Sequence, residues 1–203
     1  MCYRFTPLSL AEAEGALDAL ARTGRATVPA DGATPPDARP GATVPLFRLR
    51  PDGTFEVAEL TWGFEAPWGG AGKLVFNTRL DTAVQHAQRG EGLWARPLLE
   101  GRCIVPLRAF WESNSRERAA GGRGKRQVRF DPAAGRFMLA AAVSEDGRFS
   151  VVTTAPNADV APVHDRMPLV LGPGESRTWL GPDFATLADR SRVRLRATPE
   201  ADA

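Results

Sequence analysis

The sequence predicts an α+β fold, a single domain built on a curved, barrel-like and mostly antiparallel sheet with a few flanking helices. Three observations predict it. Short strand-like segments recur between Gly- and Pro-rich turns, whereas helical periodicity occurs in only a few places. The 203 residues are 43% hydrophobic and 25% charged, as in globular domains. Many short strands with few helices favour a sheet that curves on itself.

The first expected element is a helix over residues 8–22. Ser9 can cap it, and Glu12 stands three residues later, which is the spacing of a capping box. Apolar residues then recur at helical intervals until Gly24, which is expected to end the helix. Residues 28–45 combine many Pro and Gly with little apolar content, which is typical of a loop.

The pattern then changes to that of strands. Residues 45–64 predict a hairpin with Pro51-Asp52-Gly53 as its turn. A polar, basic loop is expected over 113–126, and a second loop over 161–172. The other expected elements are a strand at 73–77, a helix at 82–94, a strand at 101–113, a hairpin at 127–143, a strand at 148–156 and a short helix at 174–180.

One domain is expected to span residues 2–195, followed by a disordered tail over 196–203. The tail contains "ATPEADA", in which small and polar residues leave nothing to pack against a core. No internal repeat divides the chain.

Charge and cysteine content narrow the possible functions. The net charge of +2 argues against a strongly electrostatic binder. Lys73 and Lys125 are the only lysines, so arginine carries almost all of the positive charge. This reflects either a compositional bias or phosphate contacts, which arginine makes well. Cys2 and Cys103 form no disulfide framework. With no signal peptide and no apolar run of ~18 residues, the expectation is a soluble, cytoplasmic protein without a membrane partner.

Cys2 directly follows the initiator Met1. Cysteine is small enough to permit methionine removal, which would leave Cys2 with a free α-amine beside its own thiol. No other position in a chain carries these two nucleophiles on one residue. The alternative is that the position has no function.

Two candidate proton-transfer groups stand out. Glu112 follows Ala109-Phe110-Trp111 at the end of an expected strand. A carboxylate beside aromatic rings is partly desolvated, which raises its pKa and lets it act as an acid. The alternative is an exposed strand end. His164 lies in the tight turn "HDRMP", and histidine can transfer protons near neutral pH, although a lone histidine is often structural.

Other polar residues occupy places where a strand pattern predicts apolar ones. Asn77 ends an apolar strand and can donate and accept hydrogen bonds, or it can simply close a turn. Arg79, two residues later, points to the same face of an extended segment. Trp68, in the Gly-rich stretch "APWGGAGK", is the best candidate for an exposed ring on which a base could stack.

Two site types are excluded by spacing. The glycines around Trp68 do not match a phosphate-binding loop, which argues against nucleoside triphosphate binding. The two cysteines and two histidines lack paired-ligand spacing, which argues against a zinc site. No metal or other cofactor is therefore expected.

Five features occur together and in order: Cys2 with Arg4, "WGF…PW", "NTRLDT", "GRCIVPLRAFWE" and "TTAPNADVAPVHDRMPLVL". Together they resemble the SRAP family, the SOS-response-associated peptidases, also described as abasic-site processing proteins. The resemblance extends from Cys2 to about Trp179, so it covers nearly the whole chain.

The resemblance implies a function in DNA damage and the SOS response. A protein of this family binds single-stranded DNA and links covalently to an abasic site through its processed amino-terminal cysteine, here as a monomer associated with the nucleoid when bound. It implies Cys2 as nucleophile, Asn77 and His164 beside it, and Glu112 as the acid–base group. The positions that it implies for DNA binding are Arg4, Trp68, Arg79, Thr153 and Arg166. Weak lyase and autoproteolytic activities are also implied.

The sequence departs from the usual family pattern near several of these residues. Tyr3 stands where glycine usually follows the cysteine, and Asp81 replaces a glutamate. The usual "GFYEW" is "AFWES", which puts Ser113 after the glutamate, and "AAAV" at 140–143 replaces "AGLW". The implied site residues are retained, so activity is expected, while its rate and reversibility are open. Two rival functions stay open as well: a hydrolase with an amino-terminal cysteine nucleophile, and a non-covalent binder of single-stranded DNA.

Overall fold

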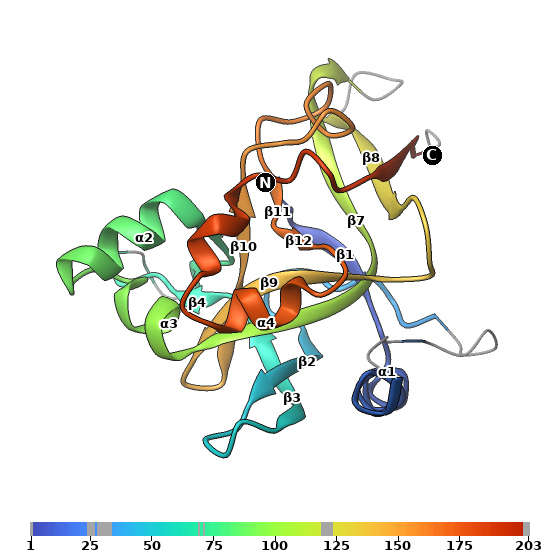
Figure 1. Ribbon diagram of the computed structural model, residues 1–203. Coiled ribbons are helices and arrows are strands. Elements are labelled where there is room, and N and C mark those ends of the chain that lie inside the picture. The colour runs from blue at the N-terminus through green and yellow to red at the C-terminus, as the bar shows by residue number, and fades with distance from the viewer. Residues whose placement is uncertain are drawn as a thin grey trace.

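The computed structural model describes residues 2–23, 27, 34–68, 70, 72–118 and 124–200, and it confirms the α+β fold with a large, mostly antiparallel sheet (Figure 1). The strands are β1 (Arg4–Pro7), β2 (Thr43–Leu49), β3 (Phe55–Trp62), β4 (Phe64–Glu65), β5 (Leu74–Val75), β6 (Asn77–Arg79), β7 (Arg102–Arg118), β8 (Lys125–Pro132), β9 (Met138–Glu145), β10 (Arg148–Thr154), β11 (Met167–Pro168), β12 (Val170–Leu171) and β13 (Leu195–Pro199). The helices are α1 (Leu10–Thr23), α2 (Leu80–Arg89), α3 (Ala95–Glu100), α4 (Glu175–Leu180) and the 3-10 helix η1 (Phe184–Ala188).

Five strands close into a ring. β9 pairs with β10, β10 with β3, β3 with β2 and β2 with β7, and β7 returns to β9. Only the pairing of β10 with β3 is parallel within this ring. The ring accounts for the barrel-like curvature that the many short strands predict, because closure leaves these strands without a free edge.

Side chains that alternate along the ring strands form two cores. On β9, Ala140 and Ala142 join an inner cluster that draws residues from all five ring strands. Ala141 and Val143 point the other way and join an outer cluster, which the helices cover. Figure 1 shows α2, α3 and α4 grouped together, with α1 standing apart from them. Cys2 belongs to the inner cluster, so the start of the chain is inserted into the ring.

A bulge in β7 determines which side chains enter the ring beyond it. The register between β1 and β7 shifts between Ala109 and Leu107, which leaves Arg108 as an extra residue. A bulge re-aims the side chains that follow it. Before it, Leu107 belongs to the inner cluster; after it, Phe110 does, and Glu112 two residues later points the same way and is fully buried.

Two expectations about β7 and its neighbours are wrong. Residues 127–143 do not form a hairpin, because β8 and β9 pair with different halves of β7 rather than with each other. The expected loop over 113–126 is shorter, since β7 extends to Arg118 and β8 begins at Lys125. The seventeen residues of β7 are long enough to serve both partners, which a short strand could not do.

The expectation of a disordered tail from residue 196 is also wrong as far as residue 200. β13 pairs with β8 in an antiparallel register from Leu195↔Pro132 to Pro199↔Val128. Buried Leu195 anchors this strand. Residues 201–203 lie outside the described part of the chain, so the tail prediction is not tested there.

The predicted helix over 8–22 is confirmed as α1, and the hairpin over 45–64 as β2 and β3. The expected end of the first helix at Gly24 lies outside the described residues, as do residues 28–33 of the expected loop. No local pattern indicates β1, which depends on its partner β7. In the described part of the chain, no helix is long and apolar enough to cross a membrane.

Candidate active site

Cys2 is buried directly before β1, with only 1% of its surface exposed. Its thiol donates a hydrogen bond to the Arg4 carbonyl, with a sulfur–oxygen distance of 3.6 Å. Burial raises the pKa of the Cys2 thiol far above its usual range, and the charge of Glu112 raises it further. The thiol is therefore protonated at neutral pH.

Asn77 holds the Cys2 backbone through a side-chain hydrogen bond. It begins β6, which lies parallel to β10 in the register Val151↔Asn77. Its Nδ2 donates to the Cys2 carbonyl at 2.7 Å. Its Oδ1 is buried and finds no hydrogen-bond partner in the described structure. A buried acceptor without a partner is costly, so this atom can favour an incoming donor.

Glu112 shares the interior with Cys2. The residue is fully buried after the β7 bulge. Burial raises the pKa of Glu112 to about 7, Asp165 raises it slightly more, and the positive charge of the chain's amino terminus opposes both. The sequence-based expectation of a desolvated carboxyl group is confirmed, although the alternative of an exposed strand end was equally open. At neutral pH this group can both give and take a proton.

His164 lies in the turn between β10 and β11 and is partly buried. Its Nδ1 accepts a hydrogen bond from the Arg166 backbone amide at 3.1 Å and lies 3.0 Å from Asp165 Oδ1. Burial lowers the pKa of His164, and the charge of the amino terminus lowers it further, while Asp165 partly opposes this shift. A neutral ring that accepts at Nδ1 from the Arg166 amide has Nε2 as its donor.

Arg79 and Arg166, here called the rim arginines, both interact with the carboxylate of Asp81. Arg166 donates to the Thr153 carbonyl at 2.7 Å and lies 3.4 Å from Asp81. Arg79 forms an ion pair with the same Asp81 at 3.0 Å. Thr153 itself is fully buried, and its hydroxyl donates inward to the Thr78 carbonyl at 3.4 Å. In this structure Thr153 positions Arg166 rather than presenting its own hydroxyl.

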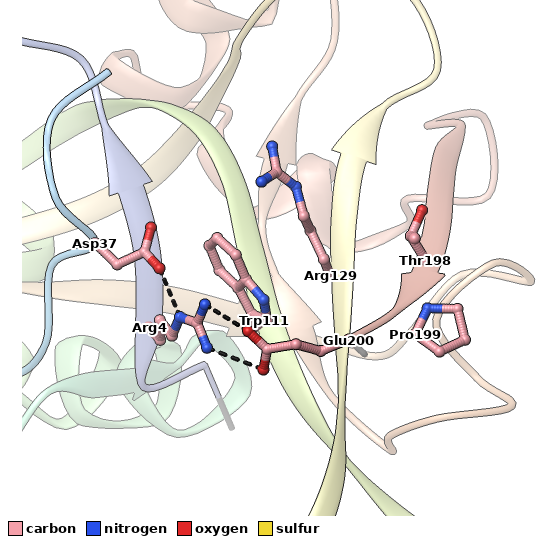
Figure 2. Close-up of a pocket in the computed structure, with 7 residues that line it drawn as sticks. All are labelled: Arg4, Asp37, Trp111, Arg129, Thr198, Pro199 and Glu200. Carbon is pink, nitrogen blue, oxygen red and sulfur yellow. Dashed lines mark hydrogen bonds and ion pairs between the residues drawn. The ribbon is translucent and has the colours of Figure 1, made fainter. Parts of the chain in front are cut away.

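Arg4 lies on the outer face of β7. Its guanidinium binds Glu200 with two hydrogen bonds of 2.8 and 3.1 Å and Asp37 with one of 2.7 Å, and it stacks 4.0 Å from the Trp111 ring (Figure 2). Arg129 stacks 5.2 Å from the same ring. A pocket of about 320 Å³ opens here, lined by Arg4, Asp37, Trp111, Arg129, Thr198, Pro199 and Glu200. Trp111 and Glu112 are adjacent in β7, so this pocket and the Glu112 carboxyl lie on opposite faces of the strand.

The structure thus brings some of the sequence-predicted residues together and leaves others apart. Cys2, Asn77 and Glu112 meet in the interior, with the His164 turn close enough for Asp165 to affect the pKa of Glu112. Trp68 is 68% exposed between β4 and β5, as expected for a stacking ring, but no described contact joins it to Cys2.

Sequence reasoning missed the carboxylates that hold the arginines. Asp37 and Glu200 bind Arg4 from 33 and 196 residues away, so no local pattern could reveal them. Asp81 was noticed only as a departure from the family pattern, although its spacing of two from Arg79 was visible. Among the described residues, no group of three or more His, Cys, Asp or Glu side chains is arranged to hold a metal ion.

Comparison with known proteins agrees with this fold. The sequence matches the family described as SOS response associated peptidase (SRAP) over residues 1–202. It is 25% identical over 138 residues to the abasic site processing proteins YoaM and YoqW of Bacillus subtilis, a match that spans 62% of this chain. That match covers only 57% of YoaM and 58% of YoqW.

Two solved structures share the architecture. A phage-related protein from Bordetella bronchiseptica superposes with a TM-score of 0.71 at 20% identity, covering 98% of this chain and 94% of the other. A protein from Bacteroides thetaiotaomicron superposes with a TM-score of 0.66 at 19% identity, covering 98% and 91%. At these identities the likeness concerns the fold alone.

Proposed function

The chain belongs to the SRAP family, and on that premise we propose that it is an abasic-site processing protein. It binds single-stranded DNA and forms a covalent link between Cys2 and the ring-opened abasic sugar, which shields the site from cleavage. The names of the Bacillus relatives support the substrate.

One observation carries the proposal. The Cys2 backbone is held by Asn77 inside the ring, beside a carboxyl group whose pKa burial raises to about 7. A structural cysteine needs neither partner. Removal of Met1 is part of the proposal, because it exposes the α-amine of Cys2 beside its thiol.

The amine is the first nucleophile. A ring-opened abasic sugar carries an aldehyde, and an α-amine has a pKa of about 7.7–8.0, so an appreciable fraction is unprotonated at neutral pH. Its attack on the aldehyde carbon gives a carbinolamine. Loss of one water, with a proton supplied to the departing hydroxyl, gives an imine.

The thiol then closes the ring. Its sulfur bonds to the same carbon, the C=N double bond becomes a single bond, and the thiol proton passes to the nitrogen. The product is a five-membered thiazolidine, and the sum of the steps releases one water. The step is intramolecular, and such proximity is worth effective molarities of up to roughly 10⁵–10⁸ M.

The surrounding groups have matching roles. Glu112 donates the proton that expels water and later passes the thiol proton on to the nitrogen, because its pKa lies near neutrality. Asn77 keeps Cys2 in position, and its buried Oδ1 can accept a hydrogen bond from the amine. His164 can donate from Nε2 to a sugar hydroxyl and so favour the open form.

The proposal also explains why single-stranded DNA is preferred to duplex DNA and what happens to the imine. A duplex would have to unstack before its sugar reached a buried residue, which costs a few kcal/mol, so single-stranded DNA is preferred. An imine can drive β-elimination of the 3′ phosphate, which predicts weak lyase activity. The thiazolidine removes the imine and leaves the strand unbroken.

The rival hydrolase is disfavoured by the same site. A cysteine hydrolase needs a thiolate at neutral pH. Here burial and the neighbouring Glu112 raise the pKa of the Cys2 thiol, which opposes thiolate formation. A proton-bearing thiol can still add to an imine, because the nitrogen takes up its proton.

The test is the intact mass of the protein before and after incubation with single-stranded DNA that contains one abasic site. The expected mass before incubation is that of the chain without Met1. The expected mass afterwards is the sum of protein and oligonucleotide less one water, and an undamaged oligonucleotide gives no such species. Retention of Met1 or absence of the adduct would refute the covalent proposal.

A further inference from the structure

Glu200 directly follows β13, and its side chain binds Arg4. Its backbone amide donates to the Gln127 carbonyl at 2.8 Å, which continues the pairing of β13 with β8 by one residue. Its carboxylate accepts from both terminal nitrogens of the Arg4 guanidinium, at 2.8 and 3.1 Å (Figure 2). The end of β13 is therefore fixed against a residue at the start of β1.

The two carboxylates that bind Arg4 are held in different ways. Asp37 accepts from Arg4 Nε at 2.7 Å and also from the Thr6 hydroxyl at 2.6 Å. The Glu200 carboxylate has no second side-chain partner in the described part of the chain, and 38% of its side chain is exposed. Ion pairs at the surface contribute little to stability, so the contact between Arg4 and Glu200 can be exchanged for another at small cost.

Glu200 covers the part of the Arg4 guanidinium that a phosphate would bind. The forked nitrogens of an arginine bind carboxylates and phosphates in the same bidentate geometry. Asp37 binds at Nε, and the Trp111 ring lies 4.0 Å from the guanidinium carbon. These two contacts do not depend on Glu200, so the guanidinium stays oriented for an anion when Glu200 leaves.

Arg4 is also close to the site of the proposed chemistry. It follows Cys2 by two residues, which span at most about 7 Å even in a fully extended chain. The Cys2 thiol donates a hydrogen bond to the Arg4 carbonyl. The pocket of about 320 Å³ beside Glu200 is lined by a second arginine, Arg129. A phosphate next to a sugar that has reached Cys2 is therefore within range of the Arg4 side chain.

We propose that Glu200 occupies a phosphate-binding position in the free protein, and that single-stranded DNA binds Arg4 by displacing the Glu200 carboxylate. That the incoming anion is a DNA phosphate rests on the proposed function. No covalent bond changes in this exchange, because one anion replaces another on the same guanidinium. Glu200 therefore weakens DNA binding, and its side chain is released when DNA is bound.

The experiment measures equilibrium binding of the whole chain to an undamaged single-stranded oligonucleotide, on which no covalent step occurs. The variant is Glu200→Gln, which keeps the shape of the side chain and removes its charge. The matched control is Glu56→Gln, which removes the same charge and also releases arginines, since Glu56 binds Arg48 and Arg50. Figure 1 shows the hairpin of β2 and β3, which carries Glu56, at the opposite end of the molecule from the amino terminus.

Glu200→Gln is expected to bind the oligonucleotide about two- to fivefold more tightly than wild type, which corresponds to the strength of a surface ion pair. Glu56→Gln should show no comparable gain. In an Arg4→Gln background, Glu200→Gln should leave the affinity unchanged, because the guanidinium for which the two anions compete is gone. Equal gains from Glu200→Gln and Glu56→Gln would overturn the proposal, as would a gain that persists in the Arg4→Gln background.

Two further measurements keep the test decisive. If Glu200→Gln melts far below wild type, Glu200→Asp replaces it: this variant keeps the net charge, and its shorter side chain reaches Arg4 less well, so a smaller gain in the same direction is expected. Failure of the proposed function is separate. Wild type that forms no adduct with abasic DNA, while Glu200→Gln still tightens binding through Arg4, would refute the covalent chemistry and retain the displacement of Glu200.

Discussion

The inner and outer faces of β7 near residue 111 place their side chains in opposite electrostatic environments. On the inner face, Glu112 is enclosed by the ring, and burial raises its pKa to about 7. On the outer face, Trp111 lies between the guanidinium groups of Arg4 and Arg129. The two side chains are neighbours in sequence and face opposite ways because a strand alternates.

The two faces also differ in how charge is balanced. Outside, Arg4 and Arg129 are matched by Asp37, Glu200 and Asp131, so every charge has a partner of opposite sign. Inside, burial raises the pKa of the Glu112 carboxyl group to about 7, so that it is partly protonated at neutral pH. The difference teaches that the inner face is suited to proton transfer and the outer face to binding and stability. Substitutions on the two faces should therefore affect different measurements.

The largest expected effect is a difference between Cys2 and Cys103, the two buried cysteines of the inner cluster. Cys2→Ala should abolish the heat-stable adduct with abasic DNA, because no thiol remains to close the ring. An imine that borohydride can trap should remain, since alanine still offers an α-amine. Cys103→Ala, which removes a thiol from the same cluster, should retain the stable adduct. Adduct yield after heating, read on a denaturing gel, checks both. A normal yield from Cys2→Ala would contradict the thiazolidine.

The next effect concerns proton transfer by Glu112. Glu112→Gln should slow both formation and reversal of the adduct by about 10²–10⁴-fold, the usual worth of general acid–base help. A catalyst of one step cannot change only one direction. Glu117→Gln, an exposed glutamate on the same strand, is the control. Formation is followed on abasic DNA, and reversal by transfer of the protein to excess unlabelled competitor. If both rates match wild type, His164 becomes the acid–base candidate.

The same substitution should change how stability depends on pH. The pKa of Glu112 is raised from 4.5 to about 7 on folding. Between these values the folded protein binds more protons than the unfolded chain, so wild type loses stability as pH rises through this window. The loss reaches at most about 3 kcal/mol above pH 7. Glu112→Gln removes this loss, so its melting temperature relative to wild type should rise by several degrees between pH 5 and pH 8.5. If the difference in melting temperature between Glu112→Gln and wild type does not change with pH, Glu112 is ionised in the folded state across this range.

The contrast between the two faces also explains what could be predicted from sequence. The barrel-like sheet followed from the number of short strand patterns, and the buried Glu112 from its aromatic neighbours. Which face Glu112 takes depends on the extra residue Arg108 in β7, and a bulge leaves no mark in the hydrophobic pattern. That is why an exposed strand end was an equally good interpretation.

Long-range pairing accounts for the remaining misses. β13 has little apolar content of its own, and it forms because β8 offers a free edge, so its sequence alone suggested disorder. The carboxylate partners of Arg4 come from distant segments, and only the folded chain brings them together.

The smallest expected effect tests the rim of the site. Arg166→Ala and Arg79→Ala should each flatten the salt dependence of single-strand binding by about 0.7, the worth of one phosphate contact. Asp81 binds both arginines, so a phosphate must compete with it. Asp81→Asn should therefore tighten binding and leave the slope as steep as wild type or steeper, and Arg136→Ala is the charge-matched control for the two arginines. Slopes measured on undamaged DNA check all four variants. Unchanged slopes for both arginines would mean that neither contacts the DNA backbone.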